Sequence, residues 1–305
     1  MVHFGLMKKT IRILMAAIPL FCGSARAATE YDRALERMTR LELAHPSTVA
    51  RFELGANDQG TAIQGLRIGH ADAAGPALLV VGVHHGNERL SGELALAFAE
   101  RVASLIDDAS DEFHGTLANR VFHVVPVLNI GGYNANRRTE INSRSQTVDP
   151  NRDYPDPCAD KPDFLLESTR ALARYVEDSS IVGAVTLHGY IGTFTHPFGY
   201  YTDNMRTLDH LVFDSVTHEA ARRNGYRVGT HGDVVYPAAG TFEDWAYLEH
   251  GVWVNLLELA SQPDIGHDTD ALLAYFSLLP TARSTQHGAT GHCTESLEEI
   301  LGSRP

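Results

Sequence analysis

Residues 77–88 read ALLVVGVHHGNE, and this stretch decides the fold that we expect for the chain. Its apolar half, residues 77–83, has the length and the β-branched content of a buried strand. A strongly amphipathic helical pattern begins a few positions later and covers residues 90–106. A strand that ends just before a helix presents His85 and Glu88 together at its carboxyl end.

The alternation of strand and helix continues along the rest of the chain. Strands are predicted at residues 49–54, 62–68, 121–128, 181–187 and 252–259, and helices at residues 30–43, 164–176, 205–223 and 268–279. This order predicts an α/β three-layer sandwich, in which helices flank a mixed, largely parallel central sheet. Residues 129–163 contain no long periodic segment, and a loop of that length is usually functional or disordered.

The composition is that of a globular protein with one large core, since 44% of the 305 residues are hydrophobic and 21% are charged. The formal net charge of −13 argues against binding to nucleic acid or to an anionic membrane surface. There is no repeat, linker or break in composition. We therefore expect a single catalytic domain over residues 28–305.

The first 27 residues have the pattern of a signal peptide. Lys8, Lys9 and Arg12 precede the apolar residues 13–22, and Ala25-Arg26-Ala27 has the form of a cleavage site. The apolar run is too short for a spanning helix. The pattern therefore predicts an exported protein, periplasmic or extracellular, without stable insertion in a membrane.

Cleavage at this site would leave two cysteines, Cys158 and Cys293. In an exported protein these could form one disulfide or remain two unpaired thiols, and the sequence does not decide between them.

Four side chains with the chemistry of a catalytic metal site fall at predicted strand ends: His85, Glu88, His188 and Glu258. Two imidazoles and one carboxylate can hold a zinc ion and leave its fourth position open for water. A second carboxylate outside the ligand set could accept a proton from that water. In a chain with 16 histidines, however, this spacing alone does not separate a metal site from structural roles.

The order of further motifs adds a resemblance to the M14 family of zinc carboxypeptidases. The motifs are HGNE at residues 85–88, DPNRDYP at 149–155, HGY at 188–190 with HPFGY at 196–200, YPAAGTFEDWAY at 236–247, and LEL at 257–259. They span nearly the whole predicted mature chain, and they resemble the segments of that family that carry the metal ligands, the carboxylate anchor, the mobile tyrosine and the catalytic glutamate.

This resemblance implies one Zn²⁺ per chain, held by His85, Glu88 and His188. It implies that Glu258 is the general base. His84 is the competing ligand, but only His85 has a glutamate three positions on, so we expect His84 to pack behind the site.

On the substrate side, the resemblance implies that Asn151 and Arg152 hold the terminal carboxylate of a peptide, a task that suits the bidentate guanidinium group. Tyr236 would close over the bound substrate. Glu243 would lie at the base of the side-chain pocket and suit a cationic group, although an outward orientation or a local pairing of this acid is an open alternative.

The family also uses an arginine that polarises the scissile carbonyl. It should lie between Asn129 and Asn151, where Arg137, Arg138 and Arg144 all qualify. We select Arg138, and the other two remain alternatives.

The function implied by the resemblance is that of a secreted zinc carboxypeptidase acting on peptides with a free C-terminal carboxylate. The HGNE motif resembles the His-Gly-Asp-Glu form of members that process murein peptides, which favours cell-wall substrates containing diaminopimelate over ordinary peptides. Two alternatives are an N-acyl amino acid deacylase of the aspartoacylase type and a non-catalytic peptide-binding relative. The tyrosine-containing motif at residues 236–247 favours the carboxypeptidase.

Overall fold

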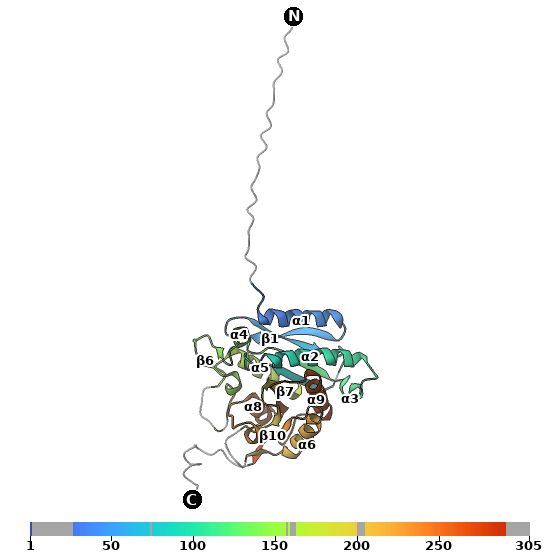
Figure 1. The fold of residues 1–305 in the computed structure, drawn as a ribbon, viewed down its shortest axis with the longest axis vertical. Coiled ribbons are helices and arrows are strands. Elements are labelled where there is room, and N and C mark those ends of the chain that lie inside the picture. Colours follow the sequence, from blue (N-terminus) through green and yellow to red (C-terminus); the bar gives the residue numbers. More distant parts are fainter. Residues whose placement is uncertain (2–26, 74, 157, 159–162, 200–204, 291–305) are drawn as a thin grey trace.

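The computed structural model describes residue 1 and residues 27–73, 75–156, 158, 163–199 and 205–290. The predicted signal peptide, apart from its two terminal residues, and Cys293 lie outside these residues. The described residues form an eight-stranded sheet with the order β1-β2-β4-β3-β7-β11-β8-β10 (Figure 1). The strands are β1 (Val49–Ala56), β2 (Ala62–Ile68), β3 (Ala77–Gly82), β4 (Val121–Val125), β7 (Ile181–Gly189), β8 (Thr193–His196), β10 (Arg227–Thr230) and β11 (Trp253–Leu259).

The four central strands, β4, β3, β7 and β11, are parallel to one another. They are buried because both faces of the sheet are covered, which explains their near-continuous apolar sequences. Pairs β1–β2, β2–β4 and β8–β11 are antiparallel. The register pairs Glu258 with His188 on adjacent strands, so these two residues reach the same carboxyl edge of the sheet.

Helix α9 (Ile265–Leu278) contacts both α2 (Arg89–Asp107) and α6 (His210–Ala221), and the three form one layer on the sheet. Phe98 of α2, Phe122 of β4 and Phe276 of α9 meet in this layer with ring centroids 5.6–5.8 Å apart. Helix α1 (Glu30–Ala44) packs against α2 and β1.

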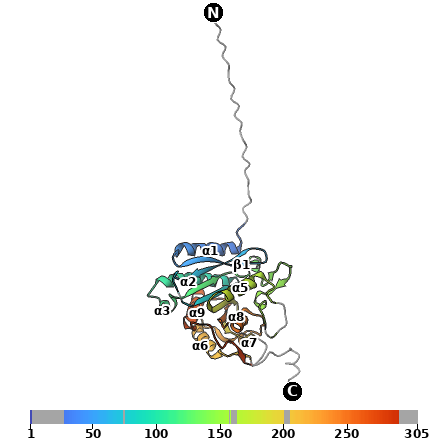
Figure 2. The ribbon, with the colours of Figure 1, turned by 180° about the vertical axis from the view of Figure 1, so that it is seen from behind.

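Away from this layer, α5 (Glu167–Asp178) packs against β1, and α8 (Phe242–His250) packs against β11 (Figure 2). The sheet with its flanking helices confirms the predicted α/β sandwich.

Short elements connect the long ones. They are α3 (His114–Leu117), α4 (Ile130–Ala135), β5 (Glu140–Ile141), β6 (Thr147–Val148), the 3-10 turn η1 (Pro150–Arg152), β9 (Arg206–Thr207), α7 (His231–Val234) and β12 (Ala289–Thr290). In the described part of residues 129–163, the aperiodic stretch contains short elements held by the packed domain: α4, β5, β6 and η1.

The first residue predicted for the helix at 205–223 was wrong. The helix expected from residue 205 begins at His210, because Arg206 and Thr207 pair instead with Thr290 and Ala289. Strands β8 and β10 and helix α8 were not predicted, since four-residue strands and a nine-residue helix carry little periodicity. Among the helices that the structure describes, none combines the length and the apolar character needed to cross a membrane.

Candidate metal centre and active site

The turn after β3 has a backbone shape that its neighbours impose. Val83, a buried β-branched residue, has φ of 54°, in the left-handed region that such residues rarely adopt. Gly86 lies so close to α4 that a Cβ atom there would meet the backbone of Gly132 at 2.1 Å and the carbonyl oxygen of Arg137 at 2.5 Å. Only glycine fits at this position, and the turn aims His85 inward.

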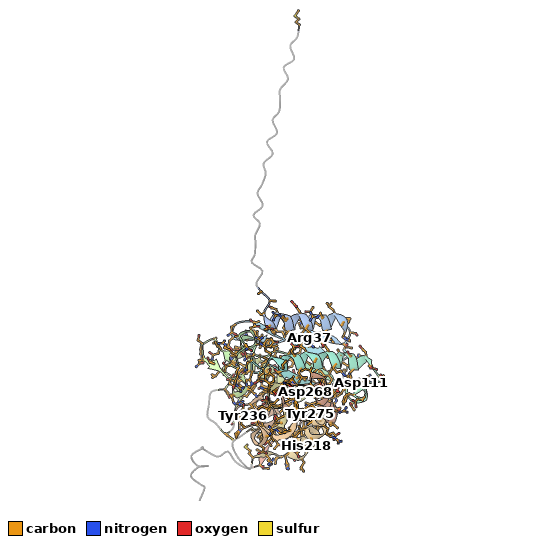
Figure 3. The ribbon with its side chains drawn as sticks, viewed as in Figure 1. Arg37, Asp111, His218, Tyr236, Asp268 and Tyr275 are labelled. Carbon is orange, nitrogen blue, oxygen red and sulfur yellow. The ribbon has the colours of Figure 1, made fainter. Side chains whose placement is uncertain are left out.

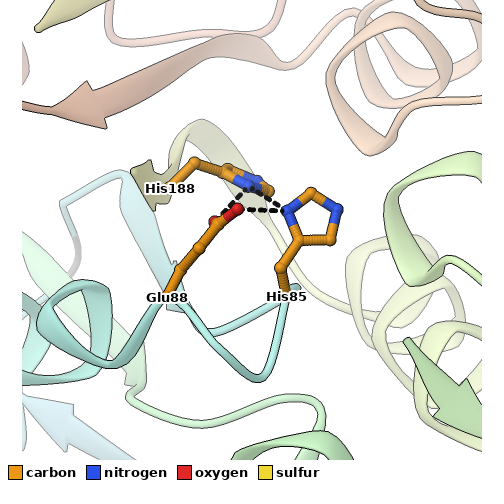
Figure 4. A group of neighbouring side chains, drawn as sticks. All are labelled: His85, Glu88 and His188. Carbon is orange, nitrogen blue, oxygen red and sulfur yellow. Dashed lines mark hydrogen bonds and ion pairs between the residues drawn. The ribbon is translucent and has the colours of Figure 1, made fainter. Parts of the chain in front are cut away.

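His85, Glu88 and His188 meet at the carboxyl edge of the sheet, where all three side chains are buried (Figure 4). The two Nδ1 atoms are 3.1 Å apart. Glu88 Oε1 lies 2.9 Å from Nδ1 of His85, and Glu88 Oε2 lies 3.1 Å from Nδ1 of His188. One donor atom from each residue thus converges on a common point from two elements far apart in the sequence.

The electrostatics of this group favour an ionised Glu88. Burial alone would raise the pKa of Glu88, but hydrogen bonds with His188 and His85 outweigh burial and lower it to about 2. Burial would lower the pKa of His188, yet the bond to Glu88 raises it. The carboxylate therefore stays charged and is available to a cation at any ordinary pH.

Asp149 supports the group from behind, a role that the sequence analysis did not assign to it. Its Oδ1 lies 3.0 Å from Nε2 of His85, and its Oδ2 accepts a hydrogen bond of 2.9 Å from Nε of Arg138. Burial opposes its ionisation, but His85 and Arg138 hold the pKa of Asp149 well below the usual range. A carboxylate on the outer nitrogen of a metal-binding histidine fixes the ring and its tautomer. The signal was in the sequence, since Asp149 opens the motif that contains Asn151.

Arg138 is the one of the three candidate arginines whose side chain approaches the triad among the described residues. Its guanidinium lies 3.5 Å from Glu88 Oε1 and remains 39% exposed, so it faces the open side of the site. Arg137 and Arg144 are exposed.

Glu258 stands beside the triad as a buried carboxylate. It is 6% exposed, and its Oε2 has no hydrogen-bond partner among the described residues. Burial raises the pKa of Glu258; the nearby His188 lowers it, and Glu88 raises it further. A carboxylate with a raised proton affinity and a vacant lone pair can accept a proton from a neighbouring molecule.

Two of the residues expected to bind a terminal carboxylate lie together. Arg152 donates a hydrogen bond of 3.1 Å to the hydroxyl of Tyr236 and packs its guanidinium 5.7 Å from the centroid of that ring. Tyr236 is 42% exposed and also makes an edge-on contact with His231, at 5.3 Å between centroids. Figure 3 shows Tyr236 on the opposite side of the view from Asp111, which follows the C-terminal end of α2.

Glu243, on α8, is 4% exposed and lines a small cavity with His231, His196, Asp244 and other residues. It accepts hydrogen bonds from Thr186 and Asn151. Burial lowers the pKa of His231 to about 3, so this ring is neutral. The cavity therefore lies next to Asn151, which bonds Glu243, and to Tyr236, which contacts His231.

His84 points away from the triad centre. Its Nε2 lies 3.2 Å from the hydroxyl of Tyr154, and its ring stacks on His188 with 5.5 Å between centroids. Burial, with the neighbouring His188 and His85, holds its pKa well below the usual range. This arrangement fits the expected packing role. Cys158 is disulfide-bonded, so it is not one of two unpaired thiols. Cys293, the other cysteine of the predicted mature chain, lies outside the described residues.

The donor set has the chemistry of a catalytic zinc centre, with two imidazoles, one ionised carboxylate and a second, unpaired carboxylate beside them. The fold and the site together define an α/β protein with a buried His₂Glu metal centre at the carboxyl edge of its sheet. A sequence profile identifies it further: the chain belongs to peptidase family M14, the zinc carboxypeptidases, and the match covers residues 35–286. Zinc is therefore its cofactor, and the triad is the group among the described residues that could hold it.

Individual relatives agree with this family. Carboxypeptidase B from Canis lupus familiaris is 29% identical over 236 residues, which are 67% of this chain and 56% of that protein. The chain thus spans little more than half the length of this relative.

Two solved structures share the fold. Bovine thrombin-activatable fibrinolysis inhibitor, in complex with tick carboxypeptidase inhibitor, aligns with a TM-score of 0.69 and 17% identity over 81% of this chain and 94% of that one. Murein-tripeptide amidase from Escherichia coli O157 aligns with a TM-score of 0.50 and 14% identity over 75% and 90%.

Proposed function

We propose that the protein is an exported, zinc-dependent carboxypeptidase that hydrolyses the C-terminal peptide bond of peptides. It would act as a single catalytic domain over residues 28–305 after removal of the signal peptide. The observation that carries the proposal is Glu258: a buried carboxylate oxygen without a hydrogen-bond partner among the described residues, on the strand next to that of His188.

His85, Glu88 and His188 would hold the zinc ion. When bound, zinc supplies Lewis-acid activation of water and of the substrate carbonyl. Glu258 would take the proton from the attacking water and then deliver it to the departing amine. Arg138, held by Asp149, would hydrogen-bond the carbonyl oxygen as negative charge develops on it.

The preference for a chain end would come from Asn151, Arg152 and Tyr236. The planar guanidinium of Arg152 can pair with a terminal carboxylate, and the Asn151 amide can donate to it. The Tyr236 hydroxyl, which contacts Arg152, would close over the substrate. A peptide amide lacks the charge that these groups bind.

The side chain of the terminal residue would extend toward Glu243, whose negative charge suits a lysine, an arginine or the amino group of diaminopimelate. The local pairing of Glu243 with Thr186 and Asn151 involves only neutral donors, so its charge is not balanced there. The structural likeness to a murein-tripeptide amidase supports cell-wall peptides as substrates.

The test is product analysis by mass spectrometry on a mixture of peptides, their C-terminal amides, N-acyl amino acids and muropeptides. We expect loss of one C-terminal residue from the free acids, no reaction of the amides, and loss of this activity in Glu258→Gln. Cleavage of only the N-acyl amino acids would instead indicate a deacylase, and the absence of any reaction would indicate a binding protein.

Selectivity is tested separately with Glu243→Gln. We expect kcat/KM for a lysine-terminated peptide to fall about tenfold or more relative to a leucine-terminated peptide, because a neutral side chain at position 243 no longer balances the cation. An unchanged ratio would remove Glu243 as a determinant of side-chain preference.

A further inference from the structure

A chain of buried hydrogen bonds connects strand β7 to the carboxylate anchor through Glu243. Thr186, two residues before His188 on β7, donates its hydroxyl proton to Glu243 Oε1. Asn151 Nδ2 donates to Glu243 Oε2 at 3.2 Å. Glu243 thus uses both of its oxygens as acceptors for neutral donors on two other elements.

These bonds determine which way the Asn151 carboxamide points. Its Oδ1 accepts a hydrogen bond of 2.9 Å from the backbone N–H of Phe242, at the start of α8. Its Nδ2 donates to Glu243 Oε2 and also lies 3.5 Å from Nε2 of His188. Turning the carboxamide over would put the NH₂ group against the Phe242 N–H and the carbonyl oxygen against the Glu243 carboxylate. Both contacts would be repulsive, so one orientation is selected.

The surroundings make this selection strong. Asn151, Thr186 and Glu243 are all at most 4% exposed, so water cannot replace a missing partner. Among the described residues, the hydrogen bonds to the Glu243 carboxylate come from Thr186 and Asn151, both neutral donors. Its two carboxylate oxygens are therefore directed by Thr186 and Asn151, rather than by a positive group.

We propose that Glu243 and Thr186 are positioning residues for the carboxylate anchor: they keep the Asn151 carboxamide turned so that Nδ2, and not Oδ1, is the atom that donates to the terminal carboxylate of any substrate. The inference rests on the proposed role of Asn151. It assigns Glu243 a task that is independent of the substrate's side chain, and it gives Thr186 a role in binding although Thr186 contacts no substrate.

The two tasks of Glu243 depend on different properties. Recognition of a cation needs the negative charge, whereas orientation of Asn151 needs only an acceptor oxygen. Glu243→Gln removes the charge and keeps an acceptor, and the Thr186 hydroxyl can then accept from the new amide. Glu243→Leu removes both. Thr186→Val removes only the hydroxyl that directs Glu243, and Thr186→Ser retains it.

The experiment uses the zinc-loaded protein with zinc content measured for every variant. Binding of a leucine-terminated tripeptide and of its C-terminal amide is measured by calorimetry in a Glu258→Gln background, so that the peptide is not consumed. Asn151→Ala sets the size of the full loss. In the enzyme with Glu258 intact, kcat and KM are measured for the same peptide acid.

We expect Thr186→Val and Glu243→Leu to weaken binding of the acid about five- to tenfold, close to the loss in Asn151→Ala, with binding of the amide unchanged. Thr186→Ser should stay within about twofold, and Glu243→Gln within about threefold, of the parent. With Glu258 intact, the loss should appear in KM with kcat nearly unchanged, since a carboxylate anchor acts equally on the ground state and the transition state.

One result would contradict the positioning role but leave the proposed anchor intact. In it, zinc-loaded Thr186→Val binds the peptide acid within twofold of Thr186→Ser, while Asn151→Ala still binds it weakly. An equal loss of acid and amide binding would also overturn it, because it would indicate a general defect of the pocket. If Asn151→Ala bound the acid normally, the proposed anchor itself would be wrong, and the positioning role would fail with it.

Discussion

Strands β7 and β11 end in opposite ways at the two edges of the sheet. At their amino edge, Arg283 donates to the carbonyl oxygens of Ile181, Val176 and Ser179 at 2.7–2.9 Å, and the indole N–H of Trp253 donates to Ala282. At their carboxyl edge, the same strands carry His188 and Glu258, and an oxygen of Glu258 lacks a hydrogen-bond partner among the described residues.

This difference distinguishes polar groups that are buried to stabilise the fold from polar groups that are buried for the proposed reaction. Burying a polar group costs free energy unless it is hydrogen-bonded, so the paired donors of Arg283 stabilise the fold. An unpaired carboxylate such as that of Glu258 destabilises it. The fold tolerates this cost at Glu258, which lies where the proposed chemistry takes place.

The substitution Glu258→Gln tests this difference between the two edges with the largest expected effect. We expect kcat to fall about 10²- to 10⁴-fold, because a general base is lost, while the melting temperature stays the same or rises, because an unpaired buried charge is removed. Steady-state kinetics and thermal unfolding measure both. Glu177→Gln, an exposed acid on α5, is the matched control. Retained activity would contradict the proposed role.

Removal of zinc by a chelator should abolish activity and lower the stability of the carboxyl edge. Bound metal stabilises the native state by mass action, by about 2.7 kcal/mol at a free concentration one hundred times Kd. Thermal unfolding with and without added zinc measures this, and activity should return on readdition. An equally active and equally stable metal-free protein would exclude a zinc enzyme.

Arg283→Ala should have the reverse profile. Three carbonyl oxygens lose their side-chain donor, so we expect the free energy of unfolding to fall by about 3 kcal/mol, with kcat/KM unchanged in the folded protein. Urea unfolding and initial rates at 25 °C measure these quantities. A selective loss of activity would show that the two edges are coupled. The effect should be the same with and without zinc if they are independent.

Glu140, two residues after Arg138, is intermediate between the two edges, because it is a buried carboxylate that has a hydrogen-bond donor and still has a raised pKa. Burial raises its pKa to about 7, although Ser168 donates a hydrogen bond of 2.6 Å to it. The unfolded chain releases this proton near pH 4.5, before the native protein does, so Glu140 makes stability fall as pH rises from about 4.5 to about 7. Glu140→Gln should remove this fall, which is at most on the order of 3 kcal/mol. Urea unfolding across this pH range measures it, and an unchanged slope would contradict it.

Much of the fold followed from local patterns. The long apolar strands and the amphipathic helix after residue 88 appear where they were predicted, because their periodicity matches a buried, two-sided sheet. The short elements were missed, and the helix expected from residue 205 starts later. Their residues are held by partners distant in the sequence, as Thr207 is held by Ala289. The assignment of roles to the site residues remains a proposal.

What the sequence by itself determined is the set of reactive groups: His85, Glu88, His188 and Glu258 at strand ends, and the motif around Asn151. What only the tertiary structure decided is how these groups face one another. The bond from Arg138 to Asp149, the contact of Asp149 with His85 and the link from Thr186 through Glu243 to Asn151 each join segments 11 to 92 residues apart. Such contacts depend on strand register and helix packing, which no local pattern of residues records.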